Sequence, residues 1–599
     1  MLPWQEEYIS NAREIIRLRD YAGCGSAADY PASRARADDL IRRNNVLLNL
    51  CFFPVLDDLP AAAPETLQEL DAFGNALLDW KTNLDIGVYI ALHEALLRLH
   101  RVRRDRNSVI RELYKLGMGL YYQRRMVLGA ESGLNHSFDF ENELVFSEAA
   151  SYIRYFAEID DEETRGYVIR SLANIALCTH DSRRKIAIGT RVLRILRDPE
   201  IRAMAPGLPW ERFLRSTHQQ MSANRVSLSR GDLTQEELST VLDSCYEVFK
   251  PEEAAENPSL RWLWPYYEME YSCGYVSLEM TLKRLGKLIT QARWDQYDTS
   301  GLYGNIQLAC NYGQLLDRHP ALQEDPKQIA FLEQAYRKME KNLMTAPLGC
   351  FDDYFHFNLV LPFFNYAELP GITPYRDVII HLIMRFFGDD YILGRTRGDA
   401  MALCCDALLR RNPDCFKDLP LPLRPGESRR EAVLALARDG GLLMDLGRIC
   451  MNTIRRPRDL FESEYKMTLL HPAVGRDALR RRGSTRLLAD IAFGHHSWYN
   501  GSADGYPSDY IRTASPMRQM TDVAALVTYL TDNRTGSLDG LLKQVFALEG
   551  RQFSPMVTAV LDDPALQSSL ADLLAGKSRP LYDQEIHAEL SRWPVSPAV

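Results

Sequence analysis

The residues best suited to chemistry lie near the C-terminus, where two adjacent histidines, His495 and His496, stand before a loop rich in Gly, Asn and Asp. Imidazole nitrogen is a common metal ligand in proteins. Neighbouring side chains within one helical turn point about 100° apart, so the two rings could serve different ions. Asp445 and His471 lie upstream and add a carboxylate and a third imidazole. These four residues are the candidate metal ligands, although paired histidines are also common as surface or helix-capping residues.

Short sequence elements surround these candidates in a fixed order. They are Met444-Asp445-Leu446-Gly447-Arg448, Glu462-Ser463-Glu464-Tyr465 leading to His471-Pro472, the histidine pair with its loop ending in Gly505-Tyr506-Pro507, Thr531-Asp532-Asn533-Arg534, and Gln552-Phe553-Ser554-Pro555. Together they resemble the HD-GYP family of cyclic di-GMP phosphodiesterases over about residues 385–560. The resemblance implies a helical bundle in which imidazoles and carboxylates hold one to three divalent ions. Such ions lower the pKa of a bound water and neutralise the phosphate under attack.

Several positions depart from the family pattern. Met444 stands where the resemblance places a histidine and Ala525 where it places a metal-binding aspartate, and a thioether is a poor ligand for hard or borderline ions. The helix expected to open the domain, around residues 395–399, contains no histidine. Asp522, one turn before Ala525, leaves open whether a carboxylate returns to the site. Arg448 replaces a lysine and keeps the charge for a phosphate contact, with different hydrogen-bond geometry.

The surviving ligands define two alternatives for a cofactor. A degenerate domain with no cofactor is the favoured reading, because removal of ligands from a metal cluster usually abolishes the reaction. The alternative is a single Fe, Mn or Zn ion held by Asp445, His471, His495 and His496. For Asp445, an ion pair with Arg448 on the same helical turn competes with a ligand role.

Aromatic residues make the loop after the histidines a candidate surface for a partner. In the resembled family this loop is associated with contacts to diguanylate cyclase (GGDEF) domains, and aromatic side chains are favoured at protein interfaces. The loop residues assigned to this role are Trp498, Tyr499, Gly505, Tyr506 and Pro507. Nearby arginines could form an anion-receiving rim for a nucleotide phosphate or simply a solvated face; they are Arg455, Arg456, Arg458, Arg480, Arg481 and Arg482. The predicted partners are therefore a signalling protein or cyclic di-GMP.

Composition excludes several classes of protein. The formal charge of -9 argues against a general nucleic-acid binder, because phosphate contacts need a basic face. The longest apolar run, residues 46–56, is too short to span a bilayer, and the polar, acidic residues 1–7 do not fit a secretory signal. The 11 cysteines are scattered, and Cys404 and Cys405 fall on an apolar helical pattern that predicts buried thiols. We therefore expect a cytoplasmic protein in a reducing compartment, with no membrane insertion.

Helical periodicity dominates the chain and predicts an all-α fold. Residues 183–197 show it most clearly, with an apolar stripe on one side and arginines on the other. Between residues 140 and 345 the helices recur in pairs, which favours an α-solenoid of tetratricopeptide-like type. Arg191 and Arg194 occupy places where that repeat prefers small or apolar residues, so irregular helical packing is the alternative.

Prolines and a glycine mark a predicted domain boundary near residue 375. The boundary separates a helical region at residues 1–375 from an HD-GYP-like bundle at residues 376–599. His319, His356 and His381 lie outside the motifs and are expected to be structural.

The combined interpretation is a bacterial signalling protein whose C-terminal domain binds a partner protein or a cyclic dinucleotide without catalysis. The N-terminal helical region would supply a second interaction surface or a sensory input. One alternative is an active metal-dependent phosphodiesterase or phosphohydrolase with a reduced site, in which Arg448 contacts the phosphate. A second alternative is a helical-repeat scaffold that binds peptides.

Overall fold

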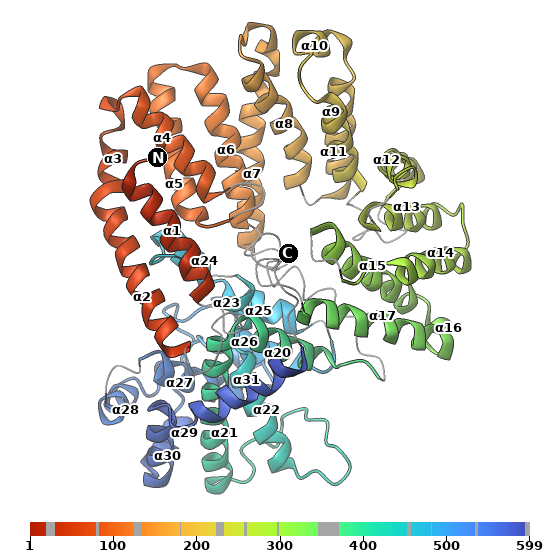
Figure 1. The fold of residues 1–599 in the computed structure, drawn as a ribbon. Helices are drawn as coiled ribbons and strands as arrows, with labels where there is room; N and C mark the ends of the chain where they lie inside the picture. The colour runs from red at the N-terminus through yellow and green to blue at the C-terminus, as the bar shows by residue number, and fades with distance from the viewer. Residues whose placement is uncertain are drawn as a thin grey trace. The chain divides into compact units, whose positions relative to one another are not determined.

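The structure, a computed structural model, is helical in all of its regular elements (Figure 1). It describes residues 1–18, 30–78, 83–124, 133–179, 181–222, 233–256, 260–295, 299–345, 371–451, 457–480, 482–533 and 537–593. Within these ranges the only β-type pairings are two isolated bridges, Leu78 with Asn83 and Glu549 with Phe553. The prediction of an all-α fold is confirmed. Among the described helices, none has the length and apolar character that crossing a membrane requires.

The chain divides into two compact units. Unit 1 comprises Met1–Arg13, Arg42–Arg125 and Gly133–Tyr354, and unit 2 comprises Glu14–Ile41, Met126–Ser132 and Phe355–Val599. The single boundary predicted near residue 375 did not include an N-terminal segment in the second unit. That segment packs Ile15, Leu18, Ala37 and Leu40 together, and its Arg34 Nε lies 2.6 Å from Asp389 Oδ2 of unit 2. Contacts between residues so distant in sequence leave no local signal.

Helices that pack on their neighbours in sequence build unit 1. They are α4 (Pro64–Leu77), α5 (Ile86–Arg103), α6 (Arg106–Arg124), α7 (Gly133–Ser151), α8 (Glu162–Cys178), α9 (Ser182–Leu196), α10 (Pro199–Met204), α11 (Trp210–Ser222), α12 (Gln235–Glu253), α13 (Leu260–Ser272), α14 (Leu278–Gln291), α15 (Thr299–Asp317), α16 (Pro320–Gln323) and α17 (Pro326–Thr345). Packing runs from α5 to α9 and on through α11, α12, α13, α15 and α17. This consecutive packing is solenoid-like, and the tetratricopeptide assignment stays a prediction.

The amphipathic helix predicted around residues 183–197 is α9. It begins after Asp181, whose carboxylate accepts a hydrogen bond from the backbone N–H of Arg184 at 2.7 Å and so caps the helix. Its apolar stripe is buried at Ile186, Val192, Leu193 and Leu196, whereas Arg191 and Arg194 are exposed. Burial of one stripe in unit 1 is therefore the reason for the pattern seen in the sequence.

A buried ionic cluster joins α5 to α6 in unit 1. The Glu112 carboxylate is 1% exposed and accepts hydrogen bonds from His93 Nδ1 at 2.6 Å and from Arg111 Nε at 3.1 Å. Burial opposes the charge on Glu112, but His93, Lys115 and Arg111 together lower the pKa of this carboxyl to about 2. The folded state therefore holds Glu112 ionised well below the pH at which an exposed glutamate takes up a proton.

This cluster predicts an acid-sensitive step in stability. The pKa of Glu112 is lower in the folded than in the unfolded chain, so its contribution is complete above about pH 5 and is lost as the pH falls toward the folded value. Between pH 7 and pH 3 the free energy of unfolding should drop by about 2 kcal/mol from this group. Urea unfolding of the full chain and of Glu112→Gln at both pH values measures this contribution of Glu112 to the free energy of unfolding. The variant should lack the contribution. An equal pH dependence in the two proteins would contradict the assignment.

Unit 2 is organised around a close crossing of α21 (Gly388–Arg411) and α22 (Arg429–Leu443). Glycines lie at the contact: a Cβ on Gly441 would fall 2.6 Å from Gly398 Cα, and a Cβ on Gly398 would fall 2.5 Å from the Arg438 carbonyl oxygen. The helix α27 (Arg518–Asp532) packs on α21, and α26 (Arg486–Gly494) packs on α22 and α27. The crossing leaves no room for a side chain and therefore fixes the backbone of α21.

The adjacent cysteines predicted to be buried thiols lie on α21. Cys404 and Cys405 are both fully buried and free, as predicted. Burial raises the pKa of the Cys404 thiol to about 12, which keeps it protonated and unreactive at neutral pH.

Candidate metal centre

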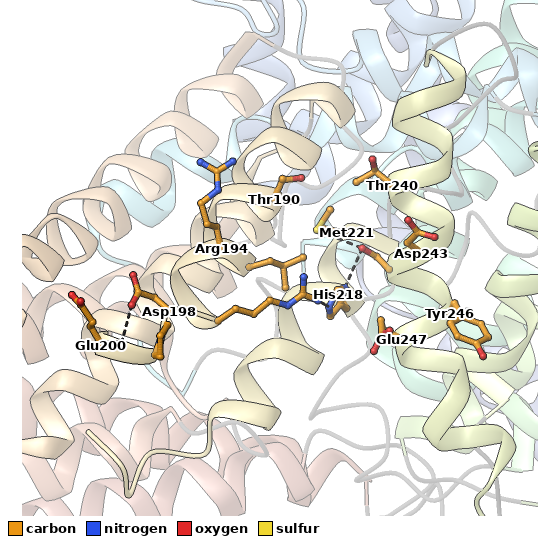
Figure 2. A pocket seen from close by; sticks show the side chains of 14 residues that line it. Thr190, Arg194, Asp198, Glu200, His218, Met221, Thr240, Asp243, Tyr246 and Glu247 are labelled. Carbon is orange, nitrogen blue, oxygen red and sulfur yellow. Dashed lines mark hydrogen bonds between the residues drawn. The ribbon is translucent and has the colours of Figure 1, made fainter. Parts of the chain in front are cut away.

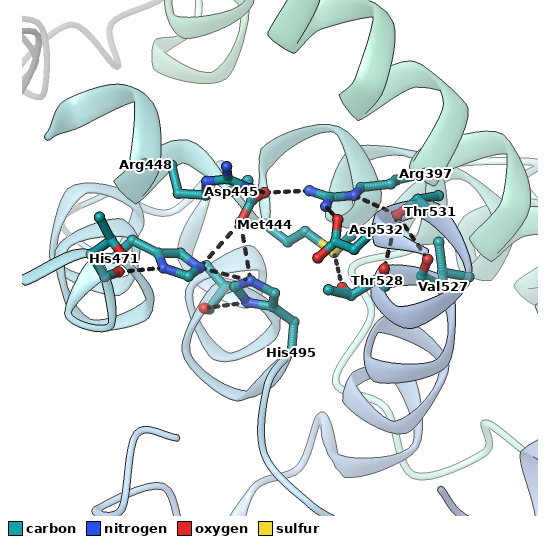
Figure 3. Close-up of polar contacts among 12 residues, drawn as sticks. Arg397, Met444, Asp445, Arg448, His471, His495, Val527, Thr528, Thr531 and Asp532 are labelled. Atoms are coloured by element: carbon teal, nitrogen blue, oxygen red, sulfur yellow. Dashed lines mark hydrogen bonds and ion pairs between the residues drawn. The ribbon is translucent and has the colours of Figure 1, made fainter. Parts of the chain in front are cut away.

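Helix ends bring the four candidate ligands together in unit 2. Figure 3 shows three of them, Asp445, His471 and His495. Asp445 stands before the short α23 (Leu446–Cys450), His471 is the first residue of α25 (His471–Leu479), and His495 and His496 directly follow α26. Because α23 packs on α25 and α25 packs on α26, these helix ends meet. One ligand atom from each residue lies within 4.8 Å of the others. The structure therefore gathers the complete set of candidate ligands.

Backbone hydrogen bonds fix the orientation of two of the imidazoles. His471 Nδ1 lies 2.7 Å from the carbonyl oxygen of Thr468, and His495 Nδ1 lies 2.8 Å from that of Ala492. A carbonyl oxygen only accepts, so each Nδ1 carries a proton, and Nε2 is the nitrogen left to bind a metal. The two Nε2 atoms lie 3.1 Å apart, and each lies 3.2 Å from Asp445 Oδ1.

Three acceptor atoms at these distances repel one another unless positive charge lies between them. A second proton on one imidazole can supply that charge, and so can a metal ion. Two imidazole nitrogens whose other nitrogens are held by carbonyl groups, together with one carboxylate oxygen, form a donor set suited to Zn, Fe or Mn. With His496 as a fourth ligand, the residues present fit one divalent ion.

Burial and nearby charge set the ionisation of the cluster. Burial opposes the charge on Asp445, but Arg397 and then the imidazoles hold the pKa of its carboxyl well below the usual range. Burial lowers the pKa of His471 despite the adjacent Asp445. Burial, reinforced by the other two imidazoles, holds the pKa of His496 well below its ordinary value. The rings of His471 and His496 are therefore neutral at pH 7, the form that coordinates metal.

A buried arginine on α21 completes the polar contacts around Asp445. Arg397 is 1% exposed; one guanidinium nitrogen donates to Asp445 Oδ2, and the other donates to Asp532 Oδ1 at 2.6 Å. Its Nε donates to Thr531 Oγ1 at 2.9 Å (Figure 3). Arg448 donates to the same Asp445 oxygen at 3.3 Å. Asp445 thus faces the imidazoles with one oxygen and two arginines with the other.

The sequence alone assigns no role to Arg397 or to Asp532, although Asp532 lies within the Thr531-Asp532-Asn533-Arg534 element. In the sequence, the segment at residues 395–399 stands out only for its lack of a histidine. Arg397 nevertheless shares a helix face with Met401, Cys404 and Leu408, which recur at three- and four-residue spacing and are all buried. An arginine on an otherwise buried apolar face is the signal that would have identified it, because buried charges are almost always paired.

The two positions predicted to have lost their ligands are buried among other groups. Met444 Sδ lies 3.7 Å from Thr528 Oγ1, and Ala525 is 9% exposed. The Asp522 carboxylate accepts hydrogen bonds from both Nε, at 2.6 Å, and a terminal nitrogen of Arg512. Asp522 is thereby held outside the four clustered ligands and does not supply the carboxylate missing at Ala525.

The aromatic rings of the loop predicted to bind a partner are half-buried within unit 2. Tyr506 stacks on His496 with ring centroids 4.4 Å apart, and its N–H donates to the His496 carbonyl oxygen at 3.2 Å. The guanidinium of Arg512 lies 4.4 Å from the centre of the Tyr499 ring, and that of Arg551 lies 5.8 Å from Trp498.

The turn at the end of this loop is tight. A Cβ on Gly505 would fall 2.6 Å from the backbone nitrogen of Trp498, and the Tyr506-Pro507 peptide is cis. The Tyr506 ring lies against the His496 and His471 rings rather than pointing outward. A role for the loop in binding a partner stays a prediction.

A pocket of about 490 Å³ opens beside the cluster. Residues that give it its chemical character are His471, His496, Arg448, Tyr465, Tyr506, Asp390 and Asp532. The Tyr465 side chain is 59% exposed, so its ring is available at the pocket edge. Burial and the neighbouring Asp389 raise the pKa of Asp390 to about 7, against the opposing effect of Arg448. The pocket therefore combines a cation, an exposed aromatic ring and a carboxyl that exchanges its proton near neutral pH.

The arginine group predicted to form an anion rim is divided by the structure. Arg458 borders the pocket, but its buried guanidinium donates to Glu464 at 2.8 Å and lies 3.6 Å from the centre of the Phe461 ring. Arg480 Nε lies 3.4 Å from Asp477 Oδ1. Arg455, Arg456 and Arg481 lie outside the described residues, and Arg482 is half-buried. Arg448, which is not one of these arginines, lines the pocket and also contacts Asp445 of the cluster.

The histidines outside the motifs contact side chains other than the candidate ligands. His319 Nε2 lies 2.9 Å from the Tyr271 hydroxyl, and His381 Nδ1 lies 3.8 Å from Glu589 Oε1. His356 lies outside the described residues.

Comparisons with known proteins give no family for this chain. No protein-family model matches it, and no similar curated protein was found. Among solved structures, a circular tandem repeat protein with novel repeat topology is 13% identical, and the match covers 98% of this chain and 95% of that protein. The TM-score of 0.13 is too low to define a shared fold. The HD-GYP resemblance therefore stays a prediction based on the motifs.

Proposed function

We propose that unit 2 binds a phosphate ester of the nucleotide or cyclic dinucleotide class through one divalent metal ion, without catalytic turnover. The observation that carries this proposal is the trio of inward-facing acceptors, His471 Nε2, His495 Nε2 and Asp445 Oδ1, at 3.1–3.2 Å from one another. Three such atoms need positive charge among them, which a divalent ion would supply, and their chemistry suits a transition metal. A signalling role for the protein follows from the motif resemblance and is part of the same proposal.

The pocket beside the cluster offers groups for the rest of the ligand. An ion held by Asp445 and the histidines would neutralise charge on a bound phosphate. Arg448, with its side chain 42% exposed, can donate to a phosphate oxygen while keeping its contact with Asp445. Tyr465 at the pocket edge offers an aromatic face for a nucleobase. Both side chains line the same pocket as His471, so one ligand can reach all three.

Binding is favoured over cleavage because two ligand positions implied by the motifs are occupied by Met444 and Ala525, and Asp522 does not replace them. One observation favours hydrolysis as a second candidate. Asp390 lines the pocket, and the pKa of its carboxyl is about 7, within the range suited to general acid–base catalysis at neutral pH. Release of a linear product from cyclic di-GMP would establish this second function.

Replacement of Arg448 by alanine tests the proposed ligand contact. A charge-assisted hydrogen bond to phosphate contributes enough that its loss should weaken binding of fluorescently labelled cyclic di-GMP or GTP by about 10- to 100-fold. Fluorescence anisotropy with Mn²⁺ present measures this affinity, and elemental analysis should show unchanged metal content. Arg430→Ala is a matched control, because that arginine pairs with Asp406 through contacts of 2.5–3.0 Å on the surface of the same unit. Unchanged affinity of the Arg448 variant, or metal-independent binding, would contradict the proposal.

A further inference from the structure

Arg397 is held in place from several directions. All three guanidinium nitrogens donate hydrogen bonds, to Asp445, Asp532 and Thr531, and the side chain is 1% exposed. Its backbone is also confined, because a Cβ on Gly441 would fall 2.5 Å from the Arg397 carbonyl carbon. The guanidinium can therefore neither swing into solvent nor withdraw along the helix. It is a fixed positive charge beside the candidate ligands.

The side chains around Arg397 carry oxygen atoms that could bind a metal ion. Asp445 precedes α23 and Asp532 ends α27, so two separate elements direct carboxylates to one point. Thr531 adds a hydroxyl oxygen to the same point. Two carboxylates and a hydroxyl are an oxygen-rich donor set of the kind that binds hard divalent ions. In this chain the positive charge between the two carboxylates is the guanidinium of Arg397 and not a metal ion.

We propose that the Arg397 guanidinium acts as a resident cation, a permanent positive charge that occupies the place of a metal ion between Asp445 and Asp532. It therefore restricts the site to one divalent ion. It also weakens the affinity for that ion. The part concerning the first ion rests on the function proposed above. Asp445 is shared: its Oδ1 faces the histidines and its Oδ2 accepts from Arg397. An ion at the histidines and the Arg397 guanidinium would therefore contact the two oxygens of the same carboxylate. The two positive charges repel each other.

A purely structural role for Arg397 predicts the opposite change. If the guanidinium only orients Asp445, then removing it should free the carboxylate and weaken metal binding. If it is a resident cation, then removing its charge should strengthen binding, because Arg448 still contacts Asp445 at 3.3 Å and Asp532, with its side chain 41% exposed, can be hydrated. The direction of the change in affinity thus separates the two roles.

Calorimetric titration of the full chain with Mn²⁺, together with elemental analysis, tests the proposal. The unaltered chain should bind one ion. Arg397→Gln, which removes the charge and retains hydrogen-bond donors, should bind Mn²⁺ at least about tenfold more tightly, with or without a second ion. Arg397→Lys keeps the charge and should stay within about threefold of the unaltered protein. Weaker binding by Arg397→Gln, or two ions in the unaltered chain, would overturn the proposal.

The outcomes also separate this inference from the proposed function. If the unaltered chain binds no ion and Arg397→Gln binds one, the resident cation is supported and metal-dependent ligand binding by the natural protein is not. If neither protein binds an ion, both proposals fail. Circular dichroism in the near ultraviolet shows whether each variant is folded. If Arg397→Gln does not fold, the number of Mn²⁺ ions bound by the unaltered chain tests the proposal instead. One bound ion supports the proposal, and two bound ions contradict it.

Discussion

Replacement of His495 by alanine is expected to abolish the proposed binding of a divalent ion. His495 is the central candidate ligand: its Nε2 lies 3.1 Å from His471 Nε2 and 3.2 Å from Asp445 Oδ1, and the residue is 1% exposed. Loss of a supporting hydrogen bond in a metal site typically costs about 10- to 100-fold in affinity, so loss of a buried ligand should cost at least about 100-fold. Elemental analysis after purification and titration with Mn²⁺ or Zn²⁺ measure the change.

A histidine outside the cluster provides the control for this prediction. His587 lies on α31 (Arg579–Arg592) of the same unit, and His587→Ala should leave the metal content unchanged. Near-ultraviolet circular dichroism should show that the His495 variant retains its fold. Equal metal content in the His495 variant and the unaltered chain would contradict the proposal of a metal centre. So would failure of the unaltered chain to take up Mn²⁺, Fe²⁺ or Zn²⁺, because a proton would then supply the charge between the imidazoles.

The helices and the candidate ligands could be read from the sequence because their signals are local. The apolar stripe of α9 repeats at the helical period, and its buried positions in the structure follow that period. His495 and His496 stand beside a Gly-rich loop, and His471 precedes a proline, so each is marked by its immediate neighbours. The structure places these residues and Asp445 within one cluster, although the spacing along the chain spans about fifty residues. Their use in binding a metal stays a prediction.

The polar contacts around the ligands could not be read in the same way. Arg397 meets Asp532 across 135 positions of sequence, and the approach depends on how α21 crosses its neighbours. Whether Asp522 could return a carboxylate was also undecidable, because the answer lies in its ion pair with Arg512, the first residue of a short 3₁₀ helix. The inclusion of the Arg34 segment in unit 2 depends on contacts with Asp389, far along the chain. Each of these features is fixed by tertiary packing, for which a single sequence carries no periodic signal.

Replacement of Gly447 by alanine is expected to damage fold and site together. Gly447 lies in α23, and a Cβ there would collide with the carbonyl oxygen of His471 and fall 2.7 Å from the backbone nitrogen of Gly475. Both atoms belong to the backbone of α25, so no side-chain rotation relieves the clash. The two helices must separate, which should lower the free energy of unfolding by more than about 3 kcal/mol. Because Asp445 precedes α23 and His471 begins α25, their 3.2 Å contact should be lost as well.

Gly540→Ala is the matched control for this substitution. Gly540 lies in α28 (Leu538–Ala547) of unit 2, where an added Cβ would meet only the Ser537 hydroxyl oxygen at 3.3 Å, and the free energy of unfolding should change by less than about 1 kcal/mol. Urea unfolding and Mn²⁺ titration of both variants measure the two effects, and metal affinity should fall at least about tenfold only in the Gly447 variant. Normal stability of that variant would contradict the close packing of α23 on α25. Reduced stability with unchanged metal affinity would show that the distance between Asp445 and His471 does not control the site, and the pairing of these two residues as ligands would then be wrong.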